Sequence, residues 1–304
     1  MNRGRISAVL VVRNEENNLL RCLNCLSWVD EIVIVDMEST DGTVALAKKF
    51  TDKIYSHPQV GFADPARNFA IEKATGPWIL MVDADEEIPS SLAYKLKELA
   101  QAPAGVSFFR LPRKNIIFGR WIKHSRWWPD YIIRFFKKGS VGFLPQVHGV
   151  PLTRGEGKDL DESEEYAIIH HNYQTVSQFL ERLNRYTSEQ VKDLSSQGYK
   201  FNWQDLVKKP TSEFLSRFFI GEGYKDGIHG LALALLQAFS ELVLYLKVWE
   251  KGEFKEEGDL EEKMMGQLKN SQKEINYWLR TIQLREAKTW LGRMLFKVFR
   301  KLGI

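Results

Sequence analysis

Short apolar runs alternate with amphipathic stretches through the first third of the chain. Continuous apolar runs are typical of strands buried on both faces of a parallel sheet, whereas apolar residues three and four apart indicate helices. Repeated strand–helix units predict an α/β fold with a mostly parallel sheet flanked by helices. We expect strands at Ile6–Val12, Glu31–Asp36, Lys53–Tyr55 and Trp78–Asp83, and helices at Glu16–Leu26, Thr43–Phe50, Pro65–Ala74 and Ser90–Ala100.

The pattern changes after residue 105. Two further strands are expected at Val106–Leu111 and Tyr131–Phe136, separated by a loop rich in tryptophan and basic residues. From Thr175 onward the chain is predicted to be helical, with a linker at Lys251–Asp259. We therefore divide the chain into residues 1–174, with halves 1–104 and 105–174, and a helical region 175–304. The helices are expected at Ser177–Leu194, Ser212–Ile220, Ile228–Trp249, Leu260–Leu279 and Arg285–Leu302.

The longest apolar run, Ile228–Leu246, has about the length of a membrane span. Four polar residues interrupt it and fall on one side of a helix with Lys247, so an amphipathic or bundled helix is expected. Cys22 and Cys25 have the spacing of a redox pair, but they lie in a helical apolar pattern that favours packing. The N-terminal residues show no secretory signal, so we expect a cytoplasmic protein.

The amino-acid composition excludes several classes of protein. Hydrophobic residues make up 44% of the 304 residues and charged residues 27%, which excludes collagen-like and wholly disordered chains. The 43 Lys+Arg against 39 Asp+Glu are too balanced to indicate a nucleic-acid partner. The nine tryptophans suit a sugar site or a membrane interface, where a side chain has one apolar and one wet end.

Candidate chemistry gathers where predicted strands end, since parallel sheets bind ligands beyond the carboxyl ends of their strands. Asp83-Ala84-Asp85 follows a buried strand, and two carboxylates two residues apart suit Mg²⁺ or Mn²⁺, which in turn hold a diphosphate. A solvated turn is the alternative. Asp36 is placed to accept hydrogen bonds from a base or ribose, unless it only forms an Asx turn. Arg67 meets either a phosphate or a surface acid.

Three segments carry a resemblance to a known family. VVRNEENNLLRCL, IVIVDMESTDGT and ARNFAIEKATGPWILMVDADEEI resemble the nucleotide-sugar half of family 2 glycosyltransferases, which have the GT-A fold. Later segments, including KNIIFGRWIKHSRWWPDYIIRFFKKG, VHG and HHNYQTVSQFLERLNRYT, resemble the branch of lipopolysaccharide core β-1,4-glucosyltransferases. The resemblance implies a Rossmann-like sheet domain with a helical C-terminal extension. It reaches about Glu250, and the remaining residues resemble no family.

The resemblance also implies residue roles on the donor side. Asn14, Glu15 and Asp36 would line the nucleoside pocket. The Asp83-Ala84-Asp85 segment would hold the metal and the donor diphosphate, with Arg67 close by. His148 would be a third metal ligand or a phosphate contact, unless it is structural.

An inverting enzyme of this kind uses one carboxylate as general base on the acceptor hydroxyl. Asp130 is the first candidate, and Glu86 and Glu87 are rivals because they follow Asp85 directly. Related chains often have Glu after the histidine of VHG, whereas this chain has Gly149. His170 and His171 are expected to be structural residues at a strand end, with at most one facing the cleft.

The C-terminal stretch Ala287–Leu302 divides into two sectors on a helical wheel. This pattern is typical of a helix lying on an anionic membrane surface, although a terminal helix packed on the domain has the same pattern. Trp290 lies near the boundary. The basic sector holds Arg293, Lys297, Arg300 and Lys301, and the apolar one Leu291, Met294, Leu295, Val298, Phe299 and Leu302.

The sequence thus predicts a metal-dependent inverting glycosyltransferase at the inner face of the cytoplasmic membrane. It would move a glucose-like hexose from a nucleotide diphosphate sugar to a cell-envelope glycan or lipid-linked acceptor. A nucleotidyltransferase that makes an activated sugar is one alternative, but it needs a glycine-rich loop after the first strand, and Arg13–Glu16 has no glycine. A non-catalytic membrane-tethering protein is another, although Asp83 and Asp85 are both present.

Overall fold

The computed structural model of the chain describes residues 4–59, 64–101, 105–144, 151–255, 261–287 and 289–302. Contacts between residues divide the chain into two units. The first unit comprises Met1–Trp121 and Trp127–Asn172, and the second comprises Ile122–Arg126 and Tyr173–Ile304. The short segment Ile122–Arg126, which lies between the two stretches of the first unit, therefore belongs with the C-terminal helices.

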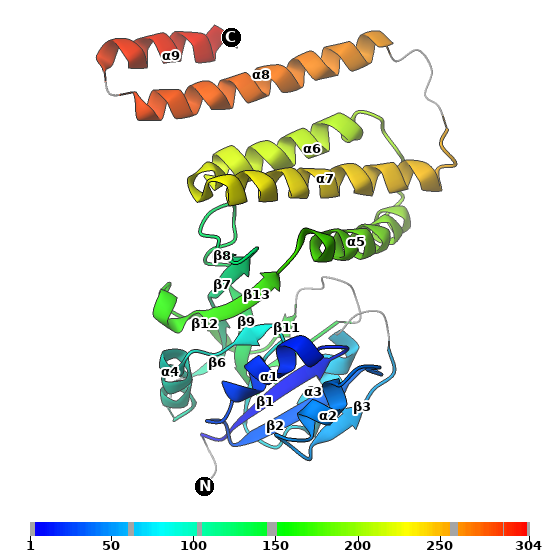
Figure 1. Ribbon diagram of the computed structural model, residues 1–304, viewed down its shortest axis with the longest axis vertical. Coiled ribbons are helices and arrows are strands. Elements are labelled where there is room, and N and C mark those ends of the chain that lie inside the picture. The colour runs from blue at the N-terminus through cyan, green and yellow to red at the C-terminus, as the bar shows by residue number, and fades with distance from the viewer. Residues whose placement is uncertain are drawn as a thin grey trace. The chain divides into compact units, whose positions relative to one another are not determined.

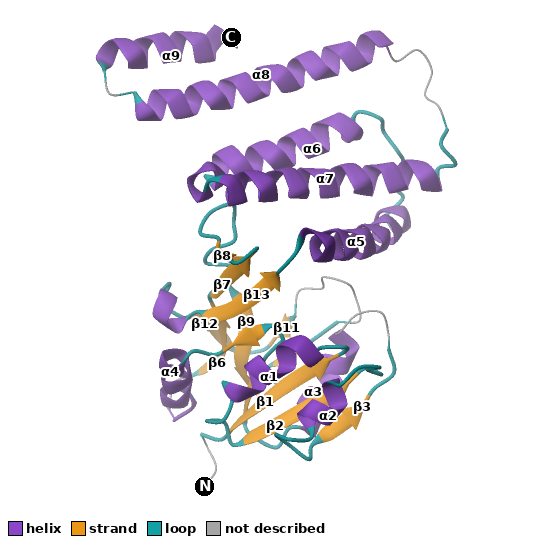
Figure 2. Ribbon diagram, in the orientation of Figure 1, coloured by secondary structure: helices purple, strands orange, loops and turns teal. Residues whose placement is uncertain are grey.

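The main sheet of the first unit has the strand order β12-β6-β9-β4-β1-β2-β3 within the described residues. β1 pairs in parallel with both β2 and β4, and β2 pairs in parallel with β3. β6 pairs in parallel with β12. β9 lies between β4 and β6 and is antiparallel to both. The predicted α/β fold with a mostly parallel sheet is confirmed (Figure 2). The strands are β1 (Ile6–Val12), β2 (Glu31–Asp36), β3 (Ile54–Ser56), β4 (Trp78–Met81), β6 (Val106–Leu111), β9 (Ile132–Lys137) and β12 (Glu156–Asp159).

Helices connect these strands near the predicted positions (Figure 1). α2 ends at Ala47 rather than at Phe50 as predicted. The chain turns there because the Thr51 hydroxyl donates to the Ile32 carbonyl, 2.8 Å away, and accepts from the Lys53 amide. The helices of this unit are α1 (Glu16–Asn24), α2 (Thr43–Ala47), α3 (Asp64–Lys73), α4 (Ser90–Gln101) and the 3-10 turn η1 (Glu164–Tyr166).

A smaller sheet of the same unit has the order β5-β13-β7-β8. β13 pairs antiparallel with β5, which places His170 opposite Glu86 and Ile169 opposite Glu87. The segment directly after Asp85 is therefore paired with a strand from much later in the chain. The remaining strands are β5 (Glu86–Glu87), β7 (Arg113–Ile117), β8 (Arg120–Trp121), β13 (Ile168–Tyr173), and the paired β10 (Val141–Gly142) and β11 (Leu152–Thr153).

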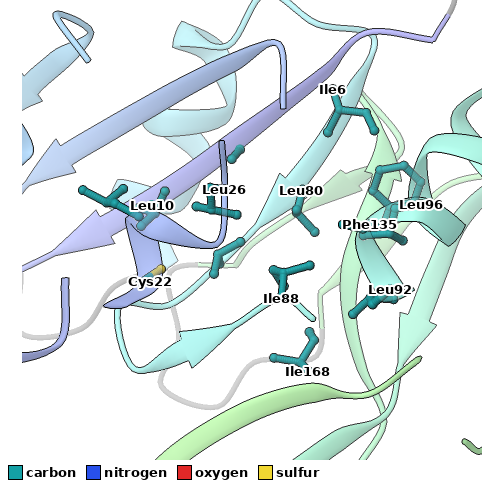
Figure 3. Packing of buried hydrophobic residues seen from close by; sticks show 14 of the residues in the cluster. Ile6, Leu10, Cys22, Leu26, Leu80, Ile88, Leu92, Leu96, Phe135 and Ile168 are labelled. Atoms are coloured by element: carbon teal, nitrogen blue, oxygen red, sulfur yellow. The ribbon is translucent and has the colours of Figure 1, made fainter. Parts of the chain in front are cut away.

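The side chains of successive residues in the central strands point to opposite faces of the main sheet. On β1, Leu10 packs in one buried cluster with residues of α1 and α4, whereas its neighbour Val9 packs in another with residues of α3. Figure 3 shows the first cluster, in which Cys22 of α1 lies among aliphatic side chains. Burial on both faces explains why these strands read as continuous apolar runs. Cys22 is a buried free thiol, as the packing interpretation predicts.

The second unit is helical within its described residues. α6 and α7 pack along each other, α7 also contacts α5, and α8 contacts both α6 and α9. The single helix predicted at Ser212–Ile220 is wrong: α6 begins earlier, contains Pro210, and passes into a wider π-type turn after Leu215. The elements are α5 (Val176–Ser196), α6 (Asp205–Leu215), η2 (Ser216–Ile220), η3 (Gly223–Asp226), α7 (Ile228–Lys251), α8 (Glu261–Glu286) and α9 (Trp290–Leu302).

Among the described helices, α7 is long and apolar enough to cross a membrane by length and composition. One third of its most apolar window is buried in the protein. Leu244, Tyr245 and Val248 pack with Val191 of α5, and the Lys247 ammonium donates to the Thr187 hydroxyl of α5, 2.9 Å away. These contacts are those of the bundled helix that the sequence predicts.

The segment Ile122–Arg126 is held by the second unit through buried polar contacts. Asp226, whose side chain is buried, accepts from the His124 amide at 2.9 Å and lies 3.0 Å from His124 Nδ1. The Ser125 amide donates to the Gly221 carbonyl at 2.7 Å. A Cβ atom at Gly223 would lie 2.3 Å from Ser125 Oγ, so only glycine fits there. Ile122–Arg126, part of the loop rich in tryptophan and basic residues, is thus anchored in part by Gly223–Gly227.

Candidate active site

The carboxyl ends of β1 and β2 are joined by hydrogen bonds. The Asn14 amide donates to the Ser39 hydroxyl at 2.9 Å, and Asn14 Oδ1 accepts from the Thr40 amide at 2.8 Å. The Glu15 amide donates to the Thr43 hydroxyl at 2.7 Å. Asn14 has a φ of 53°, a left-handed conformation that asparagine tolerates well. The predicted residues Asn14 and Glu15 therefore lie at the same sheet edge as Asp36.

Asp36 ends β2 and is buried. Its two carboxylate oxygens accept from the Ser39 amide at 3.2 and 3.4 Å, which is the local turn contact expected of an aspartate here. The same residue lines an open pocket of about 400 Å³ between α2 and β3, together with Lys48, Tyr55 and Ser56 among others. Asp36 thus has both a turn role and access to a hollow.

Asp83 lies just beyond β4 and contacts two arginines. Arg67 Nη2 lies 3.1 Å from Asp83 Oδ1, and Arg134 of β9 pairs with Asp83 Oδ2. Burial alone would raise the pKa of the Asp83 carboxyl, but Arg134 and Arg67 outweigh it and hold that pKa well below its usual range. Asp83 is therefore a carboxylate at all physiological pH values. Arg67 therefore contacts an acid of this segment, and its contact with a phosphate stays a prediction.

A buried ionic network extends from Asp83 into the smaller sheet. Arg134, which is 1% exposed, also donates to Glu86 Oε1 at 2.9 Å. Glu86 is fully buried; its other carboxylate oxygen accepts from the Asp83 amide at 3.0 Å. Burial would lower the pKa of Arg134, but the carboxylates of Asp83 and Glu86 raise it above its ordinary value. Arg113 of β7 lies 3.7 Å from Glu86 and connects the network to Asp130.

Asp85 faces His170 across the β5–β13 pairing. His170 Nε2 lies 3.6 Å from Asp85 Oδ2, and both side chains are nearly buried. His170 Nδ1 lies 2.7 Å from Asn115 Oδ1, and since that oxygen only accepts, Nδ1 carries the hydrogen. Nε2 is therefore the ring nitrogen that faces Asp85. Both histidines lie within β13 rather than at a strand end as predicted.

Asp130 lies at the edge of the same cluster, with 28% of its side chain exposed. Its Oδ2 accepts from Arg113 at 2.7 Å and from Asn115 Nδ2 at 2.8 Å. Asn115 therefore contacts both Asp130 and His170. Asp130, the general base predicted from the sequence, is therefore connected through Asn115 to His170, which faces Asp85.

The two rival acids have different surroundings. Glu86 is enclosed, with no exposed surface, so its carboxylate does not reach a bound acceptor without rearrangement. Glu87 is partly exposed; its Oε1 lies 2.5 Å from His171 Nε2 and 3.2 Å from Arg21 Nε. His171 thus faces Glu87 while His170 faces Asp85, as expected for successive residues of a strand.

One predicted ligand cannot be placed, because His148 and Gly149 lie outside the described residues. Ala84, between the two aspartates, is buried against the first hydrophobic cluster and keeps the segment against the sheet. Among the described residues no group of three or more His, Cys, Asp or Glu side chains gathers in a metal-binding arrangement. Two carboxylate–histidine pairs do meet in this region, Asp85 with His170 and Glu87 with His171.

Residues 7–152 match the sequence model of glycosyl transferase family 2. They form a family 2 glycosyltransferase domain. The match contains Asp36, Arg67, Asp83, Asp85 and Asp130, whereas His170 lies beyond it. The chain is therefore an enzyme that transfers glycosyl groups.

Relatives align with the glycosyltransferase over most of its length. An uncharacterized glycosyltransferase of Rickettsia typhi is 28% identical over 81% of this chain and 87% of its own. The lipopolysaccharide core biosynthesis glycosyltransferase LpsC of Rhizobium meliloti is 24% identical over 81% of this chain and 92% of its own. The structure of TarS 1-349 from S. aureus, in complex with UDP, aligns at a TM-score of 0.43 and 14% identity, covering 80% and 91% of the two chains.

Sequence reasoning missed two members of the cluster, Arg134 and Asn115, and interpreted a third, His170, as structural. Each lies on a different strand of the first unit, and each is buried. The sequence holds one signal for them, because Arg134 interrupts the apolar run Ile132–Phe136 and a buried charge requires a partner. The identity of that partner depends on strand pairing that the sequence does not display.

Proposed function

We propose that the enzyme is a metal-dependent, inverting glycosyltransferase. It moves a glucose-like hexose from a nucleotide diphosphate sugar to a cell-envelope glycan or lipid-linked acceptor. The observation that carries this proposal is the meeting of Asp85 and His170, 3.6 Å apart, beside Asp83 and Arg67. The similarity to LpsC, named for lipopolysaccharide core biosynthesis, supports a cell-envelope acceptor. Family membership argues against a nucleotidyltransferase.

The residues at this site fit a divalent cation. A histidine that ligates a metal usually donates its other ring N–H to an oxygen, and His170 does so to Asn115 at 2.7 Å. Asp85 and His170 would hold Mg²⁺ or Mn²⁺, which neutralises charge on the departing diphosphate when bound. Asp83 is already paired with Arg67, and it orients that guanidinium toward a donor phosphate. His148 stays a prediction as the third ligand.

The nucleoside would lie over the loops after β1 and β2. Asp36, at the start of the loop after β2, also borders the hollow between α2 and β3, and its carboxylate has lone pairs beyond the two shared with the Ser39 amide. Asn14 and Glu15 fix the shape of this edge through their backbone contacts with Ser39 and Thr43. Their side chains border the same edge. This arrangement supports a pocket for a base and ribose.

Asp130 is the proposed general base. It is 28% exposed and contacts Asn115, the partner of His170, whereas Glu86 is enclosed. Arg113 and Asn115 hold its carboxylate through the contacts at 2.7 and 2.8 Å, so its orientation is fixed before an acceptor arrives. A carboxylate held in this way removes the proton from the acceptor hydroxyl as that oxygen bonds to the sugar and the nucleoside diphosphate departs.

The metal proposal is tested with Asp85→Asn and His170→Gln. Each should weaken Mn²⁺ binding measured by calorimetry with nucleoside diphosphate present, and each should remove most transfer activity, because a donor atom is lost. Asp159→Asn is the matched control, since Asp159 is an exposed acid that pairs with Arg110 on the same unit. Full activity of the wild-type enzyme in excess chelator would show that transfer needs no metal.

The base proposal is tested with Asp130→Asn, which keeps the shape of the side chain. Proton removal by a positioned carboxylate is worth about 10²–10⁴ in rate, so turnover should fall by that factor while donor affinity stays near the wild-type value. Glu87→Gln serves as the comparison, because it removes a nearby, partly exposed acid. If Glu87→Gln abolishes turnover and Asp130→Asn does not, the base lies next to Asp85 instead.

The enzyme is also proposed to act at the inner face of the cytoplasmic membrane, attached peripherally. α9 supports this, because its apolar residues Trp290, Leu291 and Met294 are 73%, 71% and 52% exposed. Its basic residues Arg293 and Lys297 are exposed as well. A helix with these two uncovered sectors suits an anionic bilayer surface.

A further inference from the structure

A second hollow in the described residues lies where α8 ends and α9 begins. It has a volume of about 480 Å³. Figure 1 shows α9 running beside α8 at this end of the chain, and the two helices are in contact. Three of its six lining residues are cations and three are apolar: Arg285, Arg293 and Lys297, with Leu284, Trp290 and Met294.

The three cations converge from two helices. Arg293 and Lys297 are four residues apart on α9 and therefore share one face, and Arg285 faces them from the last turn of α8. Arg293 Nε donates to the Ala287 carbonyl at 3.1 Å, which fixes the base of its guanidinium. Arg285 lies 3.5 Å from Glu222 Oε1, but Glu222 also pairs with Lys225 at 2.5 Å. Glu222 is thus shared between Arg285 and Lys225, so the hollow keeps a strong positive charge.

The apolar residues of the hollow continue into an uncovered surface. Trp290 and Met294 are 73% and 52% exposed, and Leu291, Leu295 and Val298 on the same helix are exposed too. The other side of α9 faces α8, where Arg280 lies over the Phe299 ring, 5.3 Å from its centroid. The three cations of the hollow therefore lie beside an apolar surface of α9 that no described residue covers.

We propose that this hollow binds the phosphate headgroup of an anionic phospholipid in a bilayer. Arg285, Arg293 and Lys297 surround the phosphate, and Trp290 and Met294 lie against the glycerol and the first acyl carbons. A soluble phosphate ester would match the charges but not the apolar surface. A second copy of the chain is disfavoured, because a symmetric contact would bring like charges together. The proposal rests on the proposed membrane location and adds a defined site and ligand class to it.

The test compares two triple variants of the full-length enzyme in vesicle sedimentation. The first, Arg285→Ala/Arg293→Ala/Lys297→Ala, removes the cations of the hollow. The second, Lys263→Ala/Lys269→Ala/Lys273→Ala, removes the same charge from exposed positions of α8 that do not line it. On phosphatidylglycerol vesicles the first variant should bind at least about tenfold more weakly than the wild type, and the second within about threefold of it. Both should transfer sugar normally to a short soluble acceptor.

The other outcomes separate the explanations. Equal weakening of both variants would show diffuse electrostatic attraction and overturn the headgroup site while keeping the membrane location. Release of the wild type from vesicles by millimolar glycerol phosphate would show that the hollow takes a free phosphate ester, which also overturns it. A wild type that ignores phosphatidylglycerol vesicles but transfers sugar to soluble acceptors would refute the site and the membrane location, and leave the catalytic proposal intact.

Discussion

Arg134 shows how a single residue organises the site. Its guanidinium lies between Asp83 and Glu86 with 1% of its side chain exposed. Two carboxylates without this cation would stand close together in a poorly solvated place, which is costly. The arginine thereby keeps the Asp83 carboxylate charged beside Glu86 at one end of β4. The site is therefore prepared electrostatically by a residue on β9.

Replacing this arginine should be strongly destabilising. Arg134→Met keeps the length of the side chain but leaves Asp83 with Arg67 alone and the buried Glu86 with Arg113 3.7 Å away, and breaking a buried ion pair on one side costs about 3–5 kcal/mol. Urea unfolding followed by circular dichroism measures the loss. Arg110→Met is the control, because Arg110 pairs with Asp159 in an exposed position, where such pairs contribute about 0–1 kcal/mol. Equal stability of the two variants would contradict a structural role for Arg134.

The sequence reveals some site residues and hides others for a physical reason. Asp36, Asp83 and Asp85 follow apolar runs directly, so their place at strand ends follows from local pattern alone. His170 reaches Asp85 only because β13 pairs with β5, more than eighty residues earlier in the chain. That register depends on non-local packing, which no local pattern encodes.

At the scale of elements, a buried acid holds three segments together at the other end of the sheet. Glu31 begins β2, and its carboxylate pairs with the Lys53 ammonium and accepts from the Ser7 hydroxyl of β1. It also accepts from the Thr75 amide at 2.7 Å, in the turn before β4. A Cβ atom at Gly76 would lie 2.6 Å from Ser7 Oγ, so the turn also needs its glycine. These contacts hold the N-terminal ends of β1, β2 and β4 together.

The Glu31 contacts predict a pH dependence of stability. Burial would raise the pKa of Glu31, but Lys53, Ser7 and Thr75 outweigh it and lower the pKa to about 2. Because the folded pKa lies below the unfolded one, the stabilisation is complete above about pH 5 and is lost as the pH falls toward 2. Glu31→Gln should cost up to about 3 kcal/mol at pH 7 and progressively less in acid.

Urea midpoints of the wild type and Glu31→Gln at several pH values between 7 and 3 measure this dependence. Glu98→Gln is the comparison, because Glu98 forms an exposed pair with Lys95 on α4. Its difference from the wild type should stay small throughout the range. A difference for Glu31→Gln that is constant with pH would show that the charge of Glu31 does not contribute.

Elements with strong local patterns were predictable, and those held by distant contacts were not. β1, β2 and β6 have the predicted bounds. The two-residue strand β5 and the pairing of β13 carry no periodic signal, because they are defined by each other. Pro210 lies inside α6, where the local pattern favours a later start, because packing of α6 against α7 outweighs the proline.

At the scale of the whole molecule, the division into two units separates the proposed transfer site from the proposed membrane attachment. Asp85, His170 and Asp130 belong to the first unit, whereas α9 belongs to the second. The sequence alone does not show that Ile122–Arg126 joins the helical unit, because the anchoring residue Asp226 lies a hundred positions later. Chemistry and attachment can therefore be tested independently.

Deleting Ala287–Ile304 removes α9 with its exposed apolar residues and its basic sector, so the enzyme should move from the membrane pellet to the supernatant. Salt at 1 M shortens the Debye length to about 3 Å and should release part of the full-length enzyme, since only the ionic attraction is screened. Activity on a short soluble acceptor should survive, because the acids of the site lie in the other unit.

A control variant separates the two contributions of α9. Leu291→Ser/Leu295→Ser/Val298→Ser keeps every basic residue but removes exposed apolar side chains. It should still bind anionic vesicles at low salt and be released completely, rather than partly, at 1 M, because the remaining attraction is electrostatic. If the deletion variant still pellets with anionic vesicles, α9 is not the attachment. The exposed apolar face of α7, with Ile228, Leu235 and Phe239, would then be the next surface to test.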